Sequence, residues 1–404
     1  MKILEINKFN YAKGGADRHF LDLVNLLKSD GNEVAVFSMN NPKNIFSPWK
    51  KYFISYIGYN KNDSTFFQRI KGVFRMFYSR EAKIKMRKLL ADFEPEIAHI
   101  HNIYHQISPS ILTEIKKKNI PIVMTVHDYK LICPDYLLQD WEELGKHKYA
   151  KFIFGKKFKN SYLKSFLIVA EFLFHKYLDI YDKNIDCYIV PSLFVKNKLV
   201  SGGIDECKIS VLPHFFLKSQ TENYLSNESE KYVFYFGKIS KEKNVDELIA
   251  MFKEFKDAKL YLAGEIEADF QMEKNQRIKY LGVLNREEIN KHIAGALFVV
   301  SGSKLPETFG LIALEAISLE KPFLGYDFGA YSEIIDNGID GFLCQDESEF
   351  KEKARLLIQD ENLRKKFGEN ALKKSQKFRS EKYLKKIKNI FKKILKEKRL
   401  TNKQ

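Results

Sequence analysis

The stretch YVFYFGKISKEKNVDELIAMFKEFKDAKLYLA, residues 232–263, contains two short apolar runs with a helical pattern between them. The runs are Tyr232–Phe236 and Lys259–Ala263, and apolar side chains recur at three- and four-residue steps across Val245–Phe255. Apolar runs of this length predict strands, and this periodicity predicts a helix. The order strand, helix, strand is typical of a βαβ unit on a parallel sheet.

The same alternation continues on both sides and predicts an α/β protein with two Rossmann-like, doubly wound domains facing each other across a cleft. The aperiodic polar run KSQTENYLSNESE, residues 218–230, is the predicted linker. We therefore predict a first domain over residues 1–217 and a second over residues 218–378. The other predicted strands are Lys2–Ile6, Glu33–Phe37, Glu96–Ile100, Ile122–Val126, Cys187–Pro191, Ile278–Leu281, Leu297–Val300 and Pro322–Tyr326. The other predicted helices are Ala16–Ser29, one opening near Pro109, one capped by Ser192, Arg286–Ile293, Phe309–Leu319 and Ser380–Lys398.

Two segments of the first domain do not alternate in this way. Asn41–Arg80 and Trp141–Lys183 are basic and aromatic, and we predict that they are helical insertions. The last predicted helix carries an apolar stripe that must be buried against either protein or a membrane. The stripe consists of Leu384, Ile387, Phe391, Ile394 and Leu395.

Composition narrows the class of protein. The 404 residues, 45% hydrophobic and 30% charged, are typical of a globular chain of two or three domains. The four cysteines form no CxxC pair, which favours a reducing cytoplasm over a disulfide framework or a zinc ribbon. The N-terminal stretch lacks the features of a signal peptide, and no apolar run is long enough to span a bilayer, so we expect a cytoplasmic protein.

The net charge of +16 is concentrated near the C-terminus, where residues 379–404 hold eleven Lys or Arg and two Glu. This tail and the two aromatic insertions favour an anionic membrane surface that carries a lipid-linked acceptor, which would make the protein peripheral on the inner face of the plasma membrane. The alternative is a solvated helix face in a lysine-rich chain. Nucleic acid is the least favoured partner, and we do not predict it.

The strongest candidate for chemistry is PETFGLIALEA, residues 306–316. Glu307 and Glu315 are eight residues apart, so both face the side of the predicted helix above the strand ends, where ligands bind. Backbone N–H groups at the helix start attract an anion. A sugar and a ribose joined by a diphosphate would suit this arrangement, and the alternative is an amphipathic helix with two solvated glutamates. The N–H groups expected at the anion belong to Thr308, Phe309 and Gly310.

Two lysines support a diphosphate site. Lys238 and Lys243 lie in the loop GKISKEKN, residues 237–244, directly after a predicted strand. Two cations there can neutralise a diphosphate and stabilise it as it leaves, whereas ordinary loop lysines are the alternative. Gly329 opens the loop GAYSEII, residues 329–335, and we expect this loop to bring backbone close to a ligand.

The first half of the chain contains a second helix start that favours anions, in the glycine loop KGGADR at residues 13–18. This loop is neither GxGxxG nor a phosphate-binding P-loop. His127 and Asp128 end a predicted strand, where the histidine can hydrogen-bond a sugar hydroxyl; a structural histidine is the alternative. His99 and His101 lie two residues apart on a strand, but without HExxH or a clear carboxylate partner we do not favour a metal site.

Together these residues resemble retaining glycosyltransferases of family four, which have the two-domain GT-B fold, over nearly the whole chain. VHDYKLICP, residues 126–134, is similar to a subgroup that builds polysaccharides. Lys238 stands where the family has arginine and Asn244 where it has glycine, and both changes are mild. Asp17 stands where glutamate is commoner. The other segments that resemble the family are KGGADR, HIHN at 99–102, SPSIL at 108–112, GKISKEKN, the Glu-x7-Glu element from Glu307 to Glu315, and GAYSEIIDNGIDGFL at 329–343.

The resemblance implies a role for each candidate residue. Catalytic roles fall to His127 near the reacting carbon, to Glu307 on the donor-sugar hydroxyls and to Lys243 on the donor diphosphate. The resemblance also implies that no metal or other cofactor is needed, and that the last helix, residues 380–399, packs back on the first domain. The implied donor-binding residues are Gly15, Lys238, Lys243, Thr308, Phe309, Gly310, Leu311 and Glu315, the last on the ribose. The implied acceptor-side residues are Gly14, Gly15, Arg18 and Asp128.

The expected function is that of a metal-independent hexosyltransferase. It would move a sugar, with retention, from a nucleotide-diphosphate sugar to a saccharide or lipid-linked saccharide in cell-surface polysaccharide biosynthesis, of capsule or lipopolysaccharide. Three rival hypotheses remain at this point. They are another GT-B enzyme, such as a sugar-nucleotide epimerase or a phosphorylase; a metal hydrolase using His99, His101 and His127; and a non-catalytic protein that binds polyanions or membranes.

Overall fold

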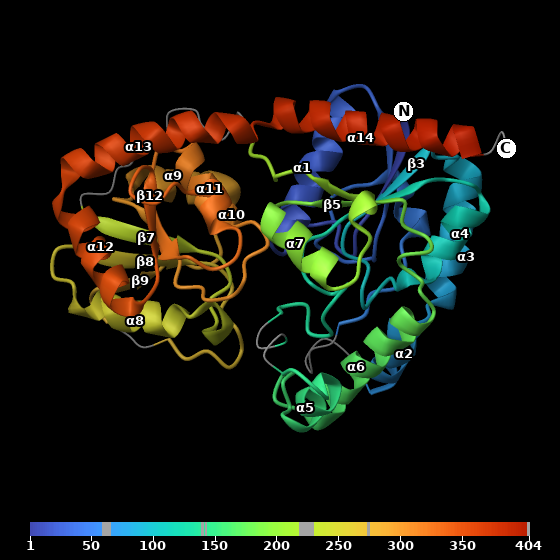
Figure 1. Cartoon of the computed structure of the whole chain (residues 1–404), viewed down its shortest axis with the longest axis horizontal. Coiled ribbons are helices and arrows are strands. Elements are labelled where there is room, and N and C mark those ends of the chain that lie inside the picture. Colours follow the sequence, from blue (N-terminus) through green and yellow to red (C-terminus); the bar gives the residue numbers. More distant parts are fainter. Residues whose placement is uncertain (59–65, 139–140, 142–143, 218–229, 273–274, 402–404) are drawn as a thin grey trace. The chain divides into compact units, whose positions relative to one another are not determined.

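The computed structural model describes residues 1–58, 66–138, 141, 144–217, 230–272 and 275–401. These residues form two compact units, each built on a parallel sheet with helices packed against it (Figure 1). The predicted α/β class with two Rossmann-like sheets is therefore confirmed. The predicted linker lies outside the described residues, apart from Glu230. The first unit comprises Met1–Pro191, Val195–Leu212 and Leu384–Gln404, and the second comprises Ser192–Phe194 and Pro213–Tyr383.

The sheet of the first unit has, within the described residues, six parallel strands in the order β2-β1-β3-β4-β5-β6. The chain runs from β1 to β2 on one side and then places β3 on the other side of β1. The strand order therefore reverses between β1 and β3, and the carboxyl ends of strands at such a reversal are where open α/β sheets bind ligands. The strands are β1 (Lys2–Ile6), β2 (Glu33–Phe37), β3 (Ile97–Ile100), β4 (Ile122–Thr125), β5 (Cys187–Val190) and β6 (Ile209–Val211).

Helices connect these strands and also form the two insertions. The segment Asn41–Arg80 contains α2, and the segment Trp141–Lys183 contains α5 and α6. The helix predicted near Pro109 begins with a short 3₁₀ turn, Pro109–Ile111, and continues as α4. The helices are α1 (Gly15–Ser29), α2 (Phe66–Phe77), α3 (Arg80–Phe93), α4 (Leu112–Lys117), α5 (Lys148–Phe154), α6 (Tyr162–Tyr177) and α7 (Leu193–Ser201).

The sheet of the second unit follows the order β12-β11-β10-β7-β8-β9, again with six parallel strands in the described part of the chain. Its order reverses between β7 and β10, so the loops after these two strands meet at one point of the sheet edge. The strands are β7 (Tyr232–Phe236), β8 (Lys259–Ala263), β9 (Ile278–Tyr280), β10 (Val299–Val300), β11 (Phe323–Tyr326) and β12 (Gly341–Cys344).

Successive side chains of β7 point to opposite faces of the sheet, and each face has its own hydrophobic core. Val233 and Tyr235 pack with α8 and α12, whereas Phe234 packs with α9 and α10 on the opposite face, and Figure 1 shows α8 and α9 on opposite sides of the strands. Such a strand is buried on both faces, as expected for a parallel sheet. The helices of this unit are α8 (Val245–Glu254), α9 (Arg286–Gly295), α10 (Leu311–Ser318), α11 (Tyr331–Ile334), α12 (Glu347–Gln359) and α13 (Glu361–Ser375).

The last helix, α14 (Ser380–Thr401), belongs to the first unit from Leu384 onward. Its predicted apolar stripe is covered by protein. Ile387 and Phe391 are fully buried, and the Phe391 ring lies 5.5 Å from the ring of His99. The stripe is therefore occupied by contacts within the first unit, which leaves the lysine face of the helix at the surface.

Two predicted boundaries in the second unit were wrong. The helix predicted to start at Phe309 starts at Leu311, because Gly310 before it adopts a left-handed φ of +99° that a continuing helix does not allow. The strand predicted from Leu297 is reduced to the two residues of β10. The later start of α10 lengthens the loop between β10 and α10, which contains Glu307, by two residues, whereas β10 ends at Val300 as predicted.

Candidate active site

The centre of the candidate site is an ion pair at the strand reversal of the second sheet. Lys243, in the loop after β7, contacts Glu307, in the loop after β10, through Nζ and Oε1. Ser303 Oγ donates to the same Glu307 oxygen at 2.9 Å. The Lys243 and Glu307 side chains are 31% and 19% exposed, so a ligand can reach both. The structure thus brings together two of the three residues predicted to be catalytic.

Lys243 is positioned by the turn that connects β7 to α8. Ser240 is buried, and its hydroxyl accepts from the Lys243 N–H at 3.3 Å, which caps the short 3₁₀ turn Lys241–Lys243. Asn244 then adopts a left-handed φ of 57° and starts α8. Asparagine is among the few residues that tolerate this conformation besides glycine, which explains why it can stand where the resemblance places a glycine.

Glu307 is held by the loop after β11. Gly329 pairs with Glu307 in a parallel bridge, and the Ala330 N–H donates to the Glu307 carbonyl at 2.9 Å. Gly329 has a φ of +76°, and a Cβ placed on it would lie 2.3 Å from the Glu307 nitrogen. We predicted that this loop approaches a ligand with its backbone. In the structure it approaches the backbone of a candidate ligand-binding residue.

The helix start predicted to bind an anion is built differently from the prediction. Within α10 the first backbone bond runs from the Ala313 N–H to the Gly310 carbonyl at 3.0 Å, so the Leu311 and Ile312 N–H groups are the first-turn donors. Phe309 is almost fully buried, and its ring lies 5.2 Å from that of His214. Thr308 accepts a hydrogen bond from Ser192 through its carbonyl.

Glu315 and Lys238, which were also predicted to bind the donor, differ in their surroundings. Glu315, in the second turn of α10, is buried with 9% exposure, so the alternative of two solvated glutamates is wrong. Lys238 is half exposed and pairs with Glu267 at 2.5 Å and with Glu242 at 3.6 Å. Lys238 and Lys243 therefore contact different carboxylates. The sequence analysis missed Glu267, which lies in the loop after β8.

Two buried tyrosines beside Glu307 were also missed. Burial raises the pKa of Tyr235 and of Tyr331, and the nearby Glu307 carboxylate raises both further. Both therefore remain neutral phenols. Tyr331 donates to Ser301 Oγ at 3.2 Å, and a Cβ on Gly310 would lie only 2.5 Å from its ring. The Tyr331 ring thus fixes the turn that precedes α10.

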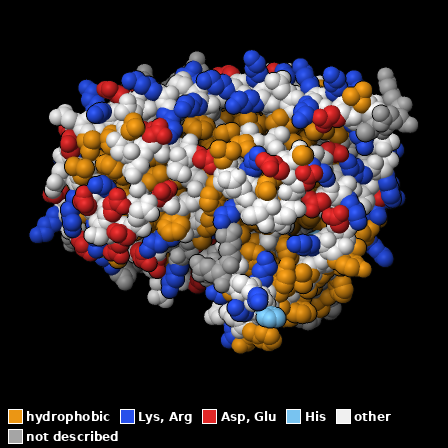
Figure 2. Space-filling model, in the orientation of Figure 1, with side chains coloured by type: hydrophobic (Ala, Val, Ile, Leu, Met, Phe, Trp, Pro, Cys, Tyr) orange, Lys and Arg blue, Asp and Glu red, His pale blue; other side chains and the backbone are white. Residues whose placement is uncertain are grey.

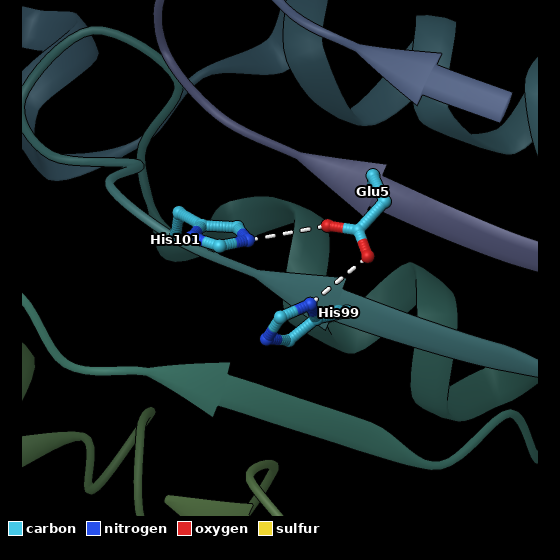
Figure 3. A group of neighbouring side chains, drawn as sticks. All are labelled: Glu5, His99 and His101. Atoms are coloured by element: carbon cyan, nitrogen blue, oxygen red, sulfur yellow. Dashed lines mark hydrogen bonds and ion pairs between the residues drawn. The ribbon is translucent and has the colours of Figure 1, made fainter. Parts of the chain in front are cut away.

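The first unit places a hydrogen-bonded chain of buried polar groups at the strand reversal of its sheet (Figure 3). Glu5 on β1 contacts His99 Nδ1 at 3.0 Å and His101 Nε2 at 3.2 Å, and all three side chains are fully buried. His99 Nε2 lies 2.8 Å from Thr125 Oγ1, and His101 Nδ1 lies 2.8 Å from His127 Nε2. The chain therefore includes His127, the first-unit residue with a predicted catalytic role.

For neutral imidazoles, this chain sets which nitrogen of His127 carries the proton. A carboxylate only accepts hydrogen bonds, so both imidazoles next to Glu5 present N–H groups to it. When His101 is the neutral tautomer that donates from Nε2, it accepts at Nδ1, so His127 donates from Nε2 and its Nδ1 is the acceptor atom. The sequence analysis missed Glu5, although a glutamate inside the apolar run KILEI was a visible signal.

Glu5, His99 and His101 also correct one premise of the metal hypothesis. Their ligand atoms lie within 4.8 Å of one another, and Glu5 is the carboxylate partner that the sequence analysis did not find. The histidine N–H groups and the Glu5 oxygens satisfy each other directly, so the cluster is complete as a hydrogen-bond network.

The other acceptor-side candidates lie at the same edge of the first sheet. Asp128 accepts from the Tyr104 hydroxyl and from the Lys130 N–H, and burial raises its pKa although the Tyr104 hydrogen bond lowers it. Gly14 and Gly15 are exposed at the start of α1, where the Arg18 N–H donates to the Gly14 carbonyl at 3.0 Å. In α1 the neighbouring His19 ring lies 5.6 Å from the His127 ring, so the glycine loop and His127 belong to one region.

Comparison with known protein families covers nearly the whole chain. Residues 13–216 match the family described as Glycosyltransferase Family 4, and residues 218–374 match the family described as Glycosyl transferases group 1. The first match alone covers half of the chain.

Two curated relatives illustrate the similarity. The N-acetyl-alpha-D-glucosaminyl L-malate synthase of Bacillus anthracis is 30% identical over 200 residues, which are 45% of this chain and 51% of that protein. The capsular polysaccharide biosynthesis glycosyltransferase CapM of Staphylococcus aureus is 27% identical over 239 residues, 52% of this chain and 62% of that protein. The chain thus spans between half and two thirds of the length of these relatives.

Solved structures share the fold over the full length. The sucrose-phosphate synthase of Thermosynechococcus elongatus has a TM-score of 0.72 at 15% identity and covers 98% of this chain and 99% of its own. Anabaena HepE in complex with UDP-glucose has a TM-score of 0.65 at 15% identity and covers 100% of this chain and 99% of its own. At these identities the likeness shows the fold alone.

Proposed function

Because the chain belongs to glycosyltransferase family 4 and has the GT-B fold, we propose that it transfers a hexose from a nucleoside-diphosphate sugar to a saccharide or lipid-linked saccharide acceptor. The proposed process is the synthesis of a surface polysaccharide, such as capsule or lipopolysaccharide. The relative CapM, named for capsular polysaccharide biosynthesis, supports this proposal. The similarity in fold to a protein that binds UDP-glucose favours uridine diphosphate as the leaving group.

One observation carries the donor part of the proposal: the Lys243–Glu307 ion pair at the strand reversal of the second sheet. A nucleotide sugar offers a phosphate group to Lys243 and hydroxyl groups to Glu307, so both residues can exchange their contact with each other for contacts with the donor. Its hydroxyls would donate to the Glu307 carboxylate, and its phosphate oxygens would accept from Lys243. Lys238, in the same loop, and the first-turn N–H groups of α10 would add positive charge at the diphosphate.

The proposed reaction retains the configuration of the transferred sugar. The bond between the sugar C1 and the diphosphate oxygen breaks, and the acceptor oxygen bonds C1 on the face that the leaving group occupied. The hydroxyl proton passes to the departing phosphate. Lysine side chains and helix N–H groups stabilise the charge on the diphosphate, which is the task that a metal ion performs in other transferases. In this proposal His127 Nδ1 accepts from a sugar hydroxyl, and the reaction proceeds without a metal.

A screen of ligands followed by a transfer assay tests the proposal. Nucleoside-diphosphate sugars with uridine, guanosine and adenosine bases are compared by thermal shift, and the stabilising sugar is then incubated with saccharide and lipid-linked acceptors. At saturating concentration we expect the matching donor to raise Tm by at least about 2 °C. A protein that no nucleotide sugar stabilises, and that consumes none of them, would not be the proposed transferase.

A further inference from the structure

Helix α6 is apolar on two opposite faces, although only one of them is covered. Ile168, Val169 and Phe172 are almost fully buried in the first unit. On the other side, Leu163, Phe166 and Tyr177 are exposed by 66%, 54% and 88%. A helix that is apolar all round is typical of the interior of a protein or of a membrane, so the uncovered face of α6 needs an explanation.

The exposed surface continues onto the neighbouring helices. The Phe174 ring of α6 lies 5.6 Å from Phe77 of α2, and both α2 and α5 pack against α6. Figure 2 shows hydrophobic side chains gathered over α6 and α2. We call this surface the aromatic patch and define it by six exposed members, which are Phe74, Phe154, Leu163, Phe166, Phe174 and Tyr177. Contiguous apolar surface of this kind marks an interaction site.

Positive charge surrounds the aromatic patch. Residues 148–178 contain seven lysines and a single acidic residue, Glu171, which is fully buried against Lys130. Lys156 Nζ lies 4.5 Å from the Tyr162 ring, which shows how closely cations and aromatic rings alternate here. A surface that combines exposed aromatic and aliphatic side chains with lysines matches the interface of a bilayer that carries anionic headgroups.

The C-terminal tail provides charge but little apolar surface. The centre of the α14 stripe is buried in the first unit, and in the described part of this helix Leu400, 58% exposed, is the one large apolar side chain that is mostly exposed. Binding in the plane of an interface requires both apolar burial and electrostatic attraction. Within the described residues no helix is long and apolar enough to cross a bilayer, so the patch would lie on the membrane rather than in it.

We propose that the aromatic patch on α2, α5 and α6 is the surface by which the first unit binds an anionic lipid bilayer. The apolar side chains insert among the headgroups, and Lys157, Lys159, Lys164 and Lys176 attract the anionic lipids. The proposal concerns membrane attachment and does not depend on the transferase activity. The sequence analysis favoured the tail together with the aromatic insertions, and the proposal assigns the membrane contact to the insertions, which offer both kinds of contact.

Vesicle flotation of the full-length protein tests the patch. We expect flotation with vesicles of equal parts phosphatidylcholine and phosphatidylglycerol and far less with phosphatidylcholine alone. The variant L163S/F166S/Y177S should lower the partition coefficient by at least about tenfold. The control V283S/I339S changes two residues of the second unit that are also exposed, by 74% and 53%, and should bind like the wild type.

A second pair of variants separates the patch from the tail. Replacing Lys157, Lys159, Lys164 and Lys176 with glutamine should lower binding to anionic vesicles by at least about tenfold, whereas the same change at Lys385, Lys386, Lys392 and Lys396 of α14 should change it less than about twofold. Equal losses from both sets, or unchanged flotation of the serine variant, would overturn the proposal. So would a wild type that does not float but forms a dimer through the patch.

Thermal shift with nucleotide sugars on the same proteins keeps the two proposals apart. A patch variant that retains the wild-type shift has a folded donor site, so its loss of flotation is specific to the membrane. A wild type that floats without any nucleotide-sugar shift would contradict the proposed function and support the membrane surface alone.

Discussion

Gly329 and Glu307 lie in such close backbone contact that a single methyl group on the glycine would occupy the space of the glutamate nitrogen, at 2.3 Å. The two residues come from the loops after β11 and β10, neighbouring strands of one sheet. The position of the Glu307 carboxylate beside Lys243 thus depends on a residue that has no functional group of its own.

We therefore expect Gly329→Ala to lower the rate of sugar transfer by more than its backbone strain alone would. The added Cβ forces the Glu307 backbone to move, and we expect kcat/KM to fall at least about tenfold. Gly338→Ala is the matched control, because Gly338 has nearly the same φ, +77°, but no atom within 4 Å of its added Cβ. The control should show only the strain of about 1–2 kcal/mol for the left-handed backbone, measured by urea unfolding, with activity retained. Equal losses of activity in the two variants would show that backbone strain alone is responsible.

Lys243→Ala and Glu307→Ala should each abolish most transfer while leaving the fold intact. Each removes a group that contacts the donor in the proposed reaction, and kcat/KM should fall at least about a hundredfold. The unliganded proteins should unfold within about 1 kcal/mol of the wild type, because a partly exposed ion pair contributes little. The exposed pair Glu287–Lys291 on α9 provides the control, since alanine at either position should leave turnover unchanged. Normal turnover in Lys243→Ala or Glu307→Ala would place the donor site elsewhere.

Glu5→Gln should change which nitrogen of His127 carries the proton, although residue 5 does not contact His127 directly but acts through His101. A glutamine amide can accept from only one of the two histidine N–H groups that face Glu5, so one of these histidines must reverse its tautomer. Where His101 reverses, it donates from Nδ1 and moves the His127 proton to Nδ1. We expect altered ¹⁵N shifts of the His127 ring and a shifted pH profile of kcat/KM, with activity lowered about tenfold.

Glu114→Gln is the control for that experiment, because Glu114 is also a carboxylate of the first unit with little exposed surface but contacts Arg87 rather than a histidine. It should leave the His127 ring shifts and the pH profile unchanged. Unaltered His127 shifts in a Glu5→Gln variant whose His101 ring shifts show a reversed tautomer would show that the chain of hydrogen bonds does not set the His127 tautomer.

Glu114 should also contribute to the pH dependence of stability. Burial alone would raise its pKa, but hydrogen bonds from Arg87, Lys117 and Lys83 lower it to about 2 from the ordinary 4.5. A carboxyl whose pKa is lower in the folded state stabilises the protein above its unfolded pKa and loses this contribution as the pH falls towards the folded value.

Urea unfolding of the wild type and Glu114→Gln at about pH 7 and about pH 3 measures this effect. We expect the variant to be about 1–3 kcal/mol less stable than the wild type at the higher pH, and the difference to shrink at the lower pH. If the difference in unfolding free energy is the same at both pH values, the variant is destabilised by changed packing rather than by the loss of charge.

Much of the local structure could be predicted because it depends on short-range pattern. Strands β1, β2, β7 and β8 begin and end at the predicted residues, since each is a mostly apolar run that is followed directly by a polar residue or glycine. The family could be identified from motifs in the right order. Strands β6 and β12 and helices α3, α12 and α13 were not predicted. For β6 the reason is that three half-buried residues carry too little pattern.

The sequence pattern could not predict which side chains contact each residue of the site. Lys238 and Lys243 are alike in the sequence, yet one contacts Glu267 and the other Glu307, because the loops after β8 and β10 approach the loop after β7 from opposite sides. Glu5 reaches His99 and His101 only because β1 and β3 pair in the register that places Glu5 beside His99.

By itself the sequence determined which segments form helices and strands, which family they compose and which side chains are candidates for chemistry, because these follow from residue order along the chain. Strand order and register were decided only in the tertiary structure, since they depend on packing between segments far apart in the sequence. The same packing decided that the apolar stripe of α14 is covered and that the outer face of α6 is not.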